Sequence, residues 1–142
     1  MAGAVRSAAE TSAWARAQEG RDRLAHTLGI ELIAIEPGLA RLRMTVTEQM
    51  LNAHGMCHGG AIFSLADVGF FYACNSGGVQ SVAAGCDINY LRPAVLNDRL
   101  EVIVRERSRS RRSGLYDAEV RNSEGQIVAV MSGRAMAVAP GT

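Results

Sequence analysis

One segment of the chain is apolar on nearly every side, and it lies between segments in which apolar and polar residues alternate. Residues 59–75 read Gly-Gly-Ala-Ile-Phe-Ser-Leu-Ala-Asp-Val-Gly-Phe-Phe-Tyr-Ala-Cys-Asn. The segment is long for a strand, and its Ala and Leu content with a stop at Gly77-Gly78 favours a helix. A helix that is apolar all round is wrapped by other structure, so we expect this one to be buried.

Alternating patterns predict strands on both sides of that helix. Residues 39–47 place Leu42, Met44 and Val46 on one face and polar residues on the other, after an expected strand at 30–36 and a turn at Pro37-Gly38. Four further strands are predicted at residues 81–91, 99–109, 115–122 and 127–138. Short turns between the last three predict an antiparallel meander. The chain is therefore expected to fold as an α+β protein.

The first 28 residues form a separate helical segment in this interpretation. Thr11-Ser12 is a candidate cap for a helix that ends at Gly29, with a frayed start. Residues 29–142 then make up the main domain.

Composition narrows the class of protein. With 142 residues the chain is expected to be one domain with a sizeable core, and its formal charge of +1 gives no case for a nucleic-acid binder. Cys57, Cys74 and Cys86 are odd in number, which suits reduced thiols in the cytoplasm. No apolar run reaches the length of a membrane span, and residues 1–9 lack the features of a secretory signal.

Asp67 is the one ionisable residue in the apolar segment. A carboxylate removed from water without a partner costs several kcal/mol or becomes protonated. An acid on the solvent-exposed face of a helix would be ordinary, but the apolar neighbours of Asp67 leave almost no solvent-exposed face. The pattern therefore favours a functional carboxylate.

The start of the same helix offers a second chemical group. Gly59-Gly60 opens the helix, where unpaired N–H groups and a partial positive charge polarise carbonyls. Gly59 and Asp67 are eight residues apart, roughly 12 Å along a helix axis. One chain cannot bring both to a single reacting carbonyl. Two such helices running antiparallel in a homodimer bring Gly59 of one against Asp67 of the other, so we expect a shared active site.

The apolar segment and two later motifs carry a family resemblance. His58 to Asp67 with Ala73-Cys74-Asn75-Ser76, then residues 84–94 (Ala-Gly-Cys-Asp-Ile-Asn-Tyr-Leu-Arg-Pro-Ala) and 114–117 (Gly-Leu-Tyr-Asp), resemble the hotdog-fold thioesterases of the phenylacetic-acid-degradation (PaaI) type. The likeness covers about residues 30–138. It implies five or six antiparallel strands wrapped around one long central helix, in dimers and usually tetramers. It also implies hydrolysis of an acyl-coenzyme A, such as (hydroxy)phenylacetyl-CoA or a related aryl or medium-chain acyl-CoA, without metal or cofactor.

The resemblance also implies roles for single residues. Asp67 matches the catalytic carboxylate, as nucleophile or as base on water, and the Gly59 N–H matches the group that polarises the thioester carbonyl. Asn52 matches a polar side chain that holds substrate or water, and His58 is expected to orient the loop. Some relatives place a Ser or Thr near the start of the next strand to hold the attacking water, whereas this chain has Ala83 there and Ser81 nearby. The choice between the two roles of Asp67 stays open.

Arginines crowd the predicted hairpin around residue 110. Leu100, Val102 and Val104 have the opposite parity to Arg105, Arg107 and Arg109, so these arginines are expected to face solvent. They either form a solvated sheet face or supply, at the hairpin end, contacts to coenzyme A phosphates, which guanidinium groups suit. The candidate coenzyme A contacts are Gly60, Arg92, Pro93, Arg109, Arg111, Arg112 and Gly114.

Three other chemistries fit the sequence less well. A metal site built from His54, Cys57, His58 and Cys74 has no standard zinc spacing. Ser64 lacks a nucleophile elbow for a Ser–His–Asp triad. A dehydratase or hydratase of the same fold would pair a His and an acid in a different loop–helix arrangement. A non-catalytic acyl-CoA-binding module remains the main alternative to the thioesterase.

Overall fold

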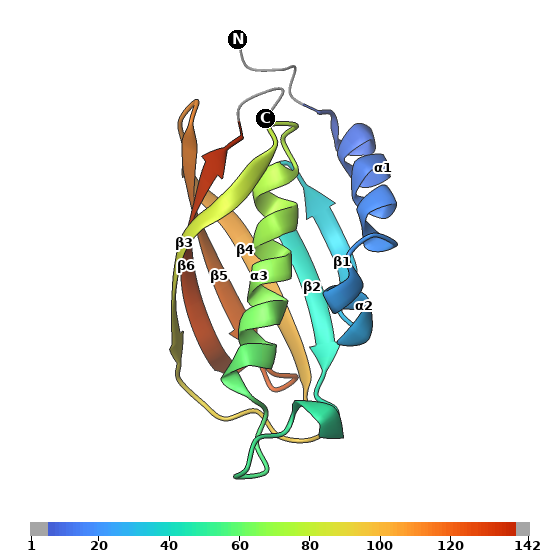
Figure 1. The fold of residues 1–142 in the computed structure, drawn as a ribbon, viewed down its shortest axis with the longest axis vertical. Helices are drawn as coiled ribbons and strands as arrows, with labels where there is room; N and C mark the ends of the chain where they lie inside the picture. Colours follow the sequence, from blue (N-terminus) through green and yellow to red (C-terminus); the bar gives the residue numbers. More distant parts are fainter. Residues whose placement is uncertain (1–5, 139–142) are drawn as a thin grey trace.

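Six antiparallel strands curve around one long helix in the computed structural model, which describes residues 6–138 (Figure 1). The strand order across the sheet is β1-β2-β4-β5-β6-β3. The strands are β1 (Glu31–Glu36), β2 (Leu39–Thr45), β3 (Ser81–Tyr90), β4 (Arg99–Arg109), β5 (Ser113–Arg121) and β6 (Ile127–Ala137). The helices are α1 (Ala8–Glu19), α2 (Arg23–Thr27), the short 3-10 helix η1 (Glu48–Met50) and α3 (Gly59–Asn75). The predicted α+β order and the β4-β5-β6 meander are confirmed.

The core lies between α3 and the inner face of the sheet. Leu42 and Met44 of β2 and Val102 and Val104 of β4 are at most 1% exposed, which confirms the faces predicted from the alternating pattern. Gly69 faces these strands, and a Cβ on it would lie 2.8 Å from Val104 Cγ2. The glycine therefore lets the helix approach the middle of the sheet closely.

The N-terminal segment forms two helices, so the prediction of a single helix capped at Thr11-Ser12 is wrong. Ser7 caps α1 in a capping box with Glu10, and Asp22 caps α2 after a break at residues 20–22. Thr11 lies inside α1, where its buried hydroxyl donates to Ser76 O. The expected frayed start falls largely on residues 1–5, which lie outside the described residues.

Aromatic contacts join this N-terminal segment to the central helix. Trp14 of α1 packs on Phe71 and Tyr72 of α3, with ring centroids 5.9 Å apart in both pairs. The α1 and α2 helices thus lie beside α3 and cover the part of it near β1 (Figure 1).

The side chain of Arg109 turns inward, so the prediction that it faces solvent with Arg105 and Arg107 is wrong. The register of β4 against β5 shifts between Glu106 and Ser108, and this bulge reverses the parity of the following residues. The Arg109 guanidinium donates to Cys74 O, Tyr116 Oη and Ser81 Oγ. Arg109 therefore holds the C-terminal end of α3 to the sheet.

The strand β3 is an edge of the sheet and is exposed along most of its length. It pairs with β6 and with no other strand among the described residues. Residues 82–87 are exposed, and they include the small residues Ala83, Ala84 and Gly85. An unpaired edge of this kind offers backbone N–H and C=O groups to another strand.

The close approach at Gly69 generates a stability prediction. Gly69→Ala is expected to lower the free energy of unfolding by about 1–3 kcal/mol, because the added methyl group overpacks the contact with Val104. Urea denaturation measures the change. Gly60→Ala is the control, since nothing lies within 4 Å of a Cβ there. A Gly69→Ala protein as stable as the Gly60→Ala protein would contradict this account of the packing.

Candidate active site

The N-terminal end of α3 carries two backbone N–H groups that have no acceptor within residues 6–138. His58 is the N-cap residue, and its side chain makes no capping hydrogen bond. The N–H groups of Ala61 and Ile62 donate to His58 O, whereas those of Gly59 and Gly60 meet no acceptor among residues 6–138. Both N–H groups lie at the positive end of the helix dipole, so this end is suited to bind a carbonyl oxygen or an oxyanion.

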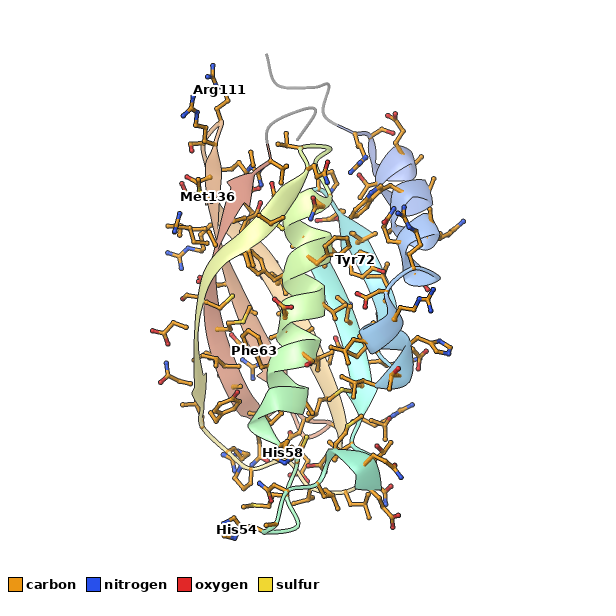
Figure 2. All side chains as sticks on the ribbon, viewed as in Figure 1. His54, His58, Phe63, Tyr72, Arg111 and Met136 are labelled. Carbon is orange, nitrogen blue, oxygen red and sulfur yellow. The ribbon has the colours of Figure 1, made fainter. Side chains whose placement is uncertain are left out.

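The loop before α3 is held in place by backbone hydrogen bonds. His58 N donates to Met50 O over 2.7 Å, and Cys57 N donates to Ala94 O over 2.8 Å. The imidazole of His58 is exposed at the end of the helix (Figure 2). The backbone of His58, rather than its ring, orients the loop, and a catalytic role for the ring stays a prediction.

The side-chain amide of Asn52 bonds to its own loop through the oxygen and not through the nitrogen. Its Oδ1 accepts from the N–H groups of His54 and Met56, over 2.9 and 3.1 Å, which fixes the loop from residue 52 to residue 56. Its Nδ2 has no acceptor among the described residues. The side chain therefore can donate to a bound molecule without disturbing the loop.

A cavity of about 310 Å³ joins these groups at the start of α3. Its lining includes Asn52, Gly59, Tyr90, Arg92 and Pro93. The structure thus brings together four of the residues predicted from the sequence. Apolar walls with a few convergent donors are typical of a small-molecule site.

Tyr90 occupies the space next to Gly59 and was not among the predicted site residues. A Cβ on Gly59 would lie 2.9 Å from Tyr90 Cζ, and the Tyr90 hydroxyl donates to Gly59 O over 2.8 Å. Only glycine fits at position 59 with the ring in this place. In the sequence Tyr90 directly precedes Leu91-Arg92-Pro93, which marks it as a neighbour of predicted site residues but does not indicate its contact with Gly59.

Asp67 lies two turns along α3, outside this cavity. It belongs to a strip of the helix that is at most partly buried in one chain, which we call the open stripe: Gly60, Phe63, Ser64, Asp67 and Phe71. Burial raises the pKa of the Asp67 carboxyl, and the charge of Asp22 raises it further. Asp67 is therefore easier to protonate than an ordinary aspartate, which suits an acid–base role. As expected, one chain does not bring Asp67 and Gly59 to the same point.

The arginine-rich hairpin lies at the opposite end of the molecule from the cavity. Figure 2 shows Arg111 at one end and His58 at the other. Arg111 and Arg112 are exposed. A Cβ on Gly114 would lie 2.8 Å from the Tyr116 ring, so glycine at this position allows the ring to pack against the backbone. Arg109 is engaged with α3. Contacts of this hairpin with coenzyme A stay a prediction.

Three further features of the described residues concern metal binding, the attacking water and membrane insertion. Among residues 6–138 no three His, Cys, Asp or Glu side chains cluster in a way that could hold a metal ion. The Ser81 hydroxyl, a candidate for holding water, is buried and bonded to Arg109 and Val79 O. No helix in the described part of the chain is long and apolar enough to cross a membrane.

The chain is similar to known thioesterases in both sequence and structure. The model of the Thioesterase superfamily matches residues 54–129. The acyl-coenzyme A thioesterase PaaI of Escherichia coli is 44% identical over 86% of this chain and 89% of its own length. The solved structure of the E. coli PaaI protein, from the phenylacetic acid degradation operon, has a TM-score of 0.92 at 40% identity and covers 94% of this chain and 97% of that one. A Streptococcus mutans protein solved with acetyl-CoA has a TM-score of 0.75 at 28% identity, over 78% and 89% of the two chains.

The raised pKa of Asp67 predicts a characteristic pH dependence of stability. Because the native state holds this proton more tightly than the unfolded state, ionisation of Asp67 destabilises the fold as pH rises above about 3.8. An asparagine side chain cannot ionise, so the Asp67→Asn variant does not lose stability in this way. Its free energy of unfolding therefore rises relative to that of the wild type as the pH increases from acidic to neutral. Chemical denaturation at a series of pH values measures the difference.

A second variant separates the two causes of the shift. Asp22→Asn removes the neighbouring charge but keeps a good N-cap for α2. NMR titration of the Asp67 carboxyl should give a lower pKa in this variant than in the wild type. An Asp67 carboxyl that titrates at or below its ordinary value in the wild type would contradict the prediction.

Proposed function

The chain belongs to the Thioesterase superfamily, and from the geometry of its central helix we propose that it hydrolyses the thioester bond of an acyl-coenzyme A. The observation that carries the proposal is the uncapped start of α3. Two free N–H groups lie there beside a cavity, and the same helix carries a partly buried carboxylate. The E. coli relative named as an acyl-CoA thioesterase supports the same reaction.

The active site is formed by two subunits in this proposal. In one chain the rise of an α-helix separates Gly59 from Asp67 by roughly 12 Å. A second copy related by a two-fold axis places its α3 antiparallel to the first, so that Gly59 of one subunit meets Asp67 of the partner subunit. Two copies then form two identical sites.

Two surfaces of the chain support this dimer. The open stripe exposes apolar groups, and its Phe71 is 38% exposed although most residues of α3 are buried. The free edge of β3 lies on the same side of the molecule, next to α3 (Figure 1). Pairing of β3 with its copy continues the sheet across the interface and brings the two open stripes together. A homotetramer of two such dimers is the assembly that we propose.

The chemistry follows from the groups at the site. The thioester carbonyl oxygen accepts hydrogen bonds from the N–H groups of Gly59 and Gly60, which stabilise the negative charge that develops on it. The carboxylate of Asp67 of the partner subunit takes a proton from water, and the resulting hydroxide adds to the carbonyl carbon. The tetrahedral intermediate then collapses, the C–S bond breaks, and the sulfur of coenzyme A leaves and takes up a proton.

Direct attack by the carboxylate is the second route. Asp67 of the partner subunit then forms a mixed anhydride with the acyl group as the C–S bond breaks, and water hydrolyses the anhydride. Single-turnover hydrolysis in H₂¹⁸O separates the two routes. The first route puts the label into the released acid, whereas the second allows it to enter the enzyme carboxylate.

The proposed substrate is an aryl or medium-chain acyl-CoA, such as phenylacetyl-CoA or its hydroxylated forms. Apolar residues line much of the cavity, including Met56, Ile62 and Leu91. The phenylacetic acid degradation operon named for the E. coli relative supports an aryl group. The free thiols Cys57, Cys74 and Cys86 support a reducing compartment, the cytoplasm.

Replacement of the carboxylate tests the proposed reaction. The wild type is expected to release free thiol from at least one of phenylacetyl-, hydroxyphenylacetyl-, benzoyl- and medium-chain acyl-CoA. Asp67→Asn should lower kcat by roughly two to four orders of magnitude, because it removes the base or nucleophile. Glu36→Gln, exposed on β1 at the opposite edge of the sheet from β3, is the control for loss of a carboxylate. Tight acyl-CoA binding without turnover by the wild type would instead indicate a binding module.

Mixed dimers test the shared site. Asp67→Asn and Gly59→Ala are each expected to be nearly inactive, but a heterodimer of the two has one intact site and one with both defects. After exchange of subunits at equal concentrations, about a quarter of the wild-type activity should return. Exchange is verified by mass spectrometry of tagged subunits. No recovery in verified heterodimers would mean that each subunit carries its own complete site.

A further inference from the structure

The hydroxyl of Tyr90 makes a hydrogen bond that local secondary structure does not require. It donates to Gly59 O over 2.8 Å, in the first turn of α3. A carbonyl at this position already has an acceptor role inside the helix, toward the N–H four residues later. The bond from Tyr90 is therefore additional, and it comes from the far end of a different element, β3.

The acceptor of this bond belongs to the peptide group that also carries a candidate catalytic N–H. Gly59 C=O and Gly60 N–H are the two ends of one planar peptide unit. Donation to the carbonyl oxygen draws electron density away from the nitrogen, so the N–H becomes a stronger donor. The Gly60 N–H has no acceptor among the described residues, and in the first turn of α3 it directly follows Gly59, which lines the cavity.

Tyr90 is well placed to hold this peptide still. Its backbone is fixed in the sheet opposite Ala129, and Leu91 N donates to Val128 O over 2.8 Å. Its ring lies where a side chain on residue 59 would be, with Cζ 2.9 Å from the position of a Cβ. Partial burial raises the pKa of the hydroxyl, so it remains a donor at neutral pH. The ring still lines the cavity and is 47% exposed.

From these contacts, and resting on the proposed thioesterase function, we infer that Tyr90 is a positioning residue for catalysis. Its hydroxyl aligns and polarises the Gly59–Gly60 peptide, so that the Gly60 N–H joins the Gly59 N–H in binding the carbonyl oxygen of the substrate. The contribution grows as negative charge develops on that oxygen. It therefore acts on the transition state more than on the bound substrate.

The test is removal of the hydroxyl alone. Tyr90→Phe keeps the ring beside Gly59 and should lower kcat by roughly three- to tenfold, with KM nearly unchanged. Tyr116→Phe is the matched control. Its hydroxyl also makes hydrogen bonds of about this length, to Glu106 and Arg109, but at the opposite end of α3. The control should lose thermal stability and keep its kcat.

An NMR measurement follows the peptide itself. The Gly60 amide ¹⁵N resonance should move upfield in Tyr90→Phe, because its peptide carbonyl loses a hydrogen bond, and should stay in place in Tyr116→Phe. An unchanged kcat, a rise in KM alone or an unmoved Gly60 resonance in Tyr90→Phe would each overturn the inference. Inactivity of the wild type toward every thioester would overturn the proposed function, and with it the catalytic role of Tyr90. An active wild type with an unaffected Tyr90→Phe variant would overturn only the role of Tyr90.

Discussion

The packing of α3 into the inner face of the sheet is the contact on which the rest of the molecule depends. The helix presents apolar residues on most of its circumference, and the sheet curves around it to remove them from water. Gly69 allows the close approach to β4. Because one curved sheet and two short helices cannot surround a helix completely, the open stripe remains. Asp67 lies on this stripe, where burial is only partial, so a carboxylate costs less there than in the core.

The two ends of α3 differ in whether their terminal backbone groups are hydrogen-bonded. At the C-terminal end the last carbonyls are bonded: side chains of Ser76, Arg109, Arg6 and Thr11 donate to the carbonyls of Ala73, Cys74, Asn75 and Ser76. At the N-terminal end the N–H groups of Gly59 and Gly60 have no acceptor in the described part of the chain. This contrast within one helix argues that the free end is kept for a ligand, since the chain satisfies the other end with four separate side chains.

In the proposed mechanism a single chain holds both halves of the hydrolytic site without joining them. The electrophilic half is the helix start with Asn52 and Tyr90, and the acid–base half is Asp67. Helix geometry keeps the two halves apart by a fixed distance, and no side-chain motion in one chain closes it. The proposed antiparallel dimer overcomes this separation, because one two-fold axis would complete both sites at once and would also cover the open stripe and the β3 edge. In this proposal one surface of the chain serves both catalysis and assembly.

The order of elements, the bounds of α3 and the inward faces of β2 and β4 could be predicted from the sequence, because they depend on local periodicity. The roles of Asp67 and Gly59 stay predictions that rest on a charge among apolar neighbours and on the start of a helix. It misplaced the start of α1, since the Ser7–Glu10 box competes with Thr11-Ser12, and Thr11 has a partner 65 residues away. The inward turn of Arg109 and the contact of Tyr90 with Gly59 became visible only in the fold. A bulge in one strand changes the direction of every side chain after it, and a bond between residues 31 apart depends on how β3 lies against α3, which no local pattern encodes.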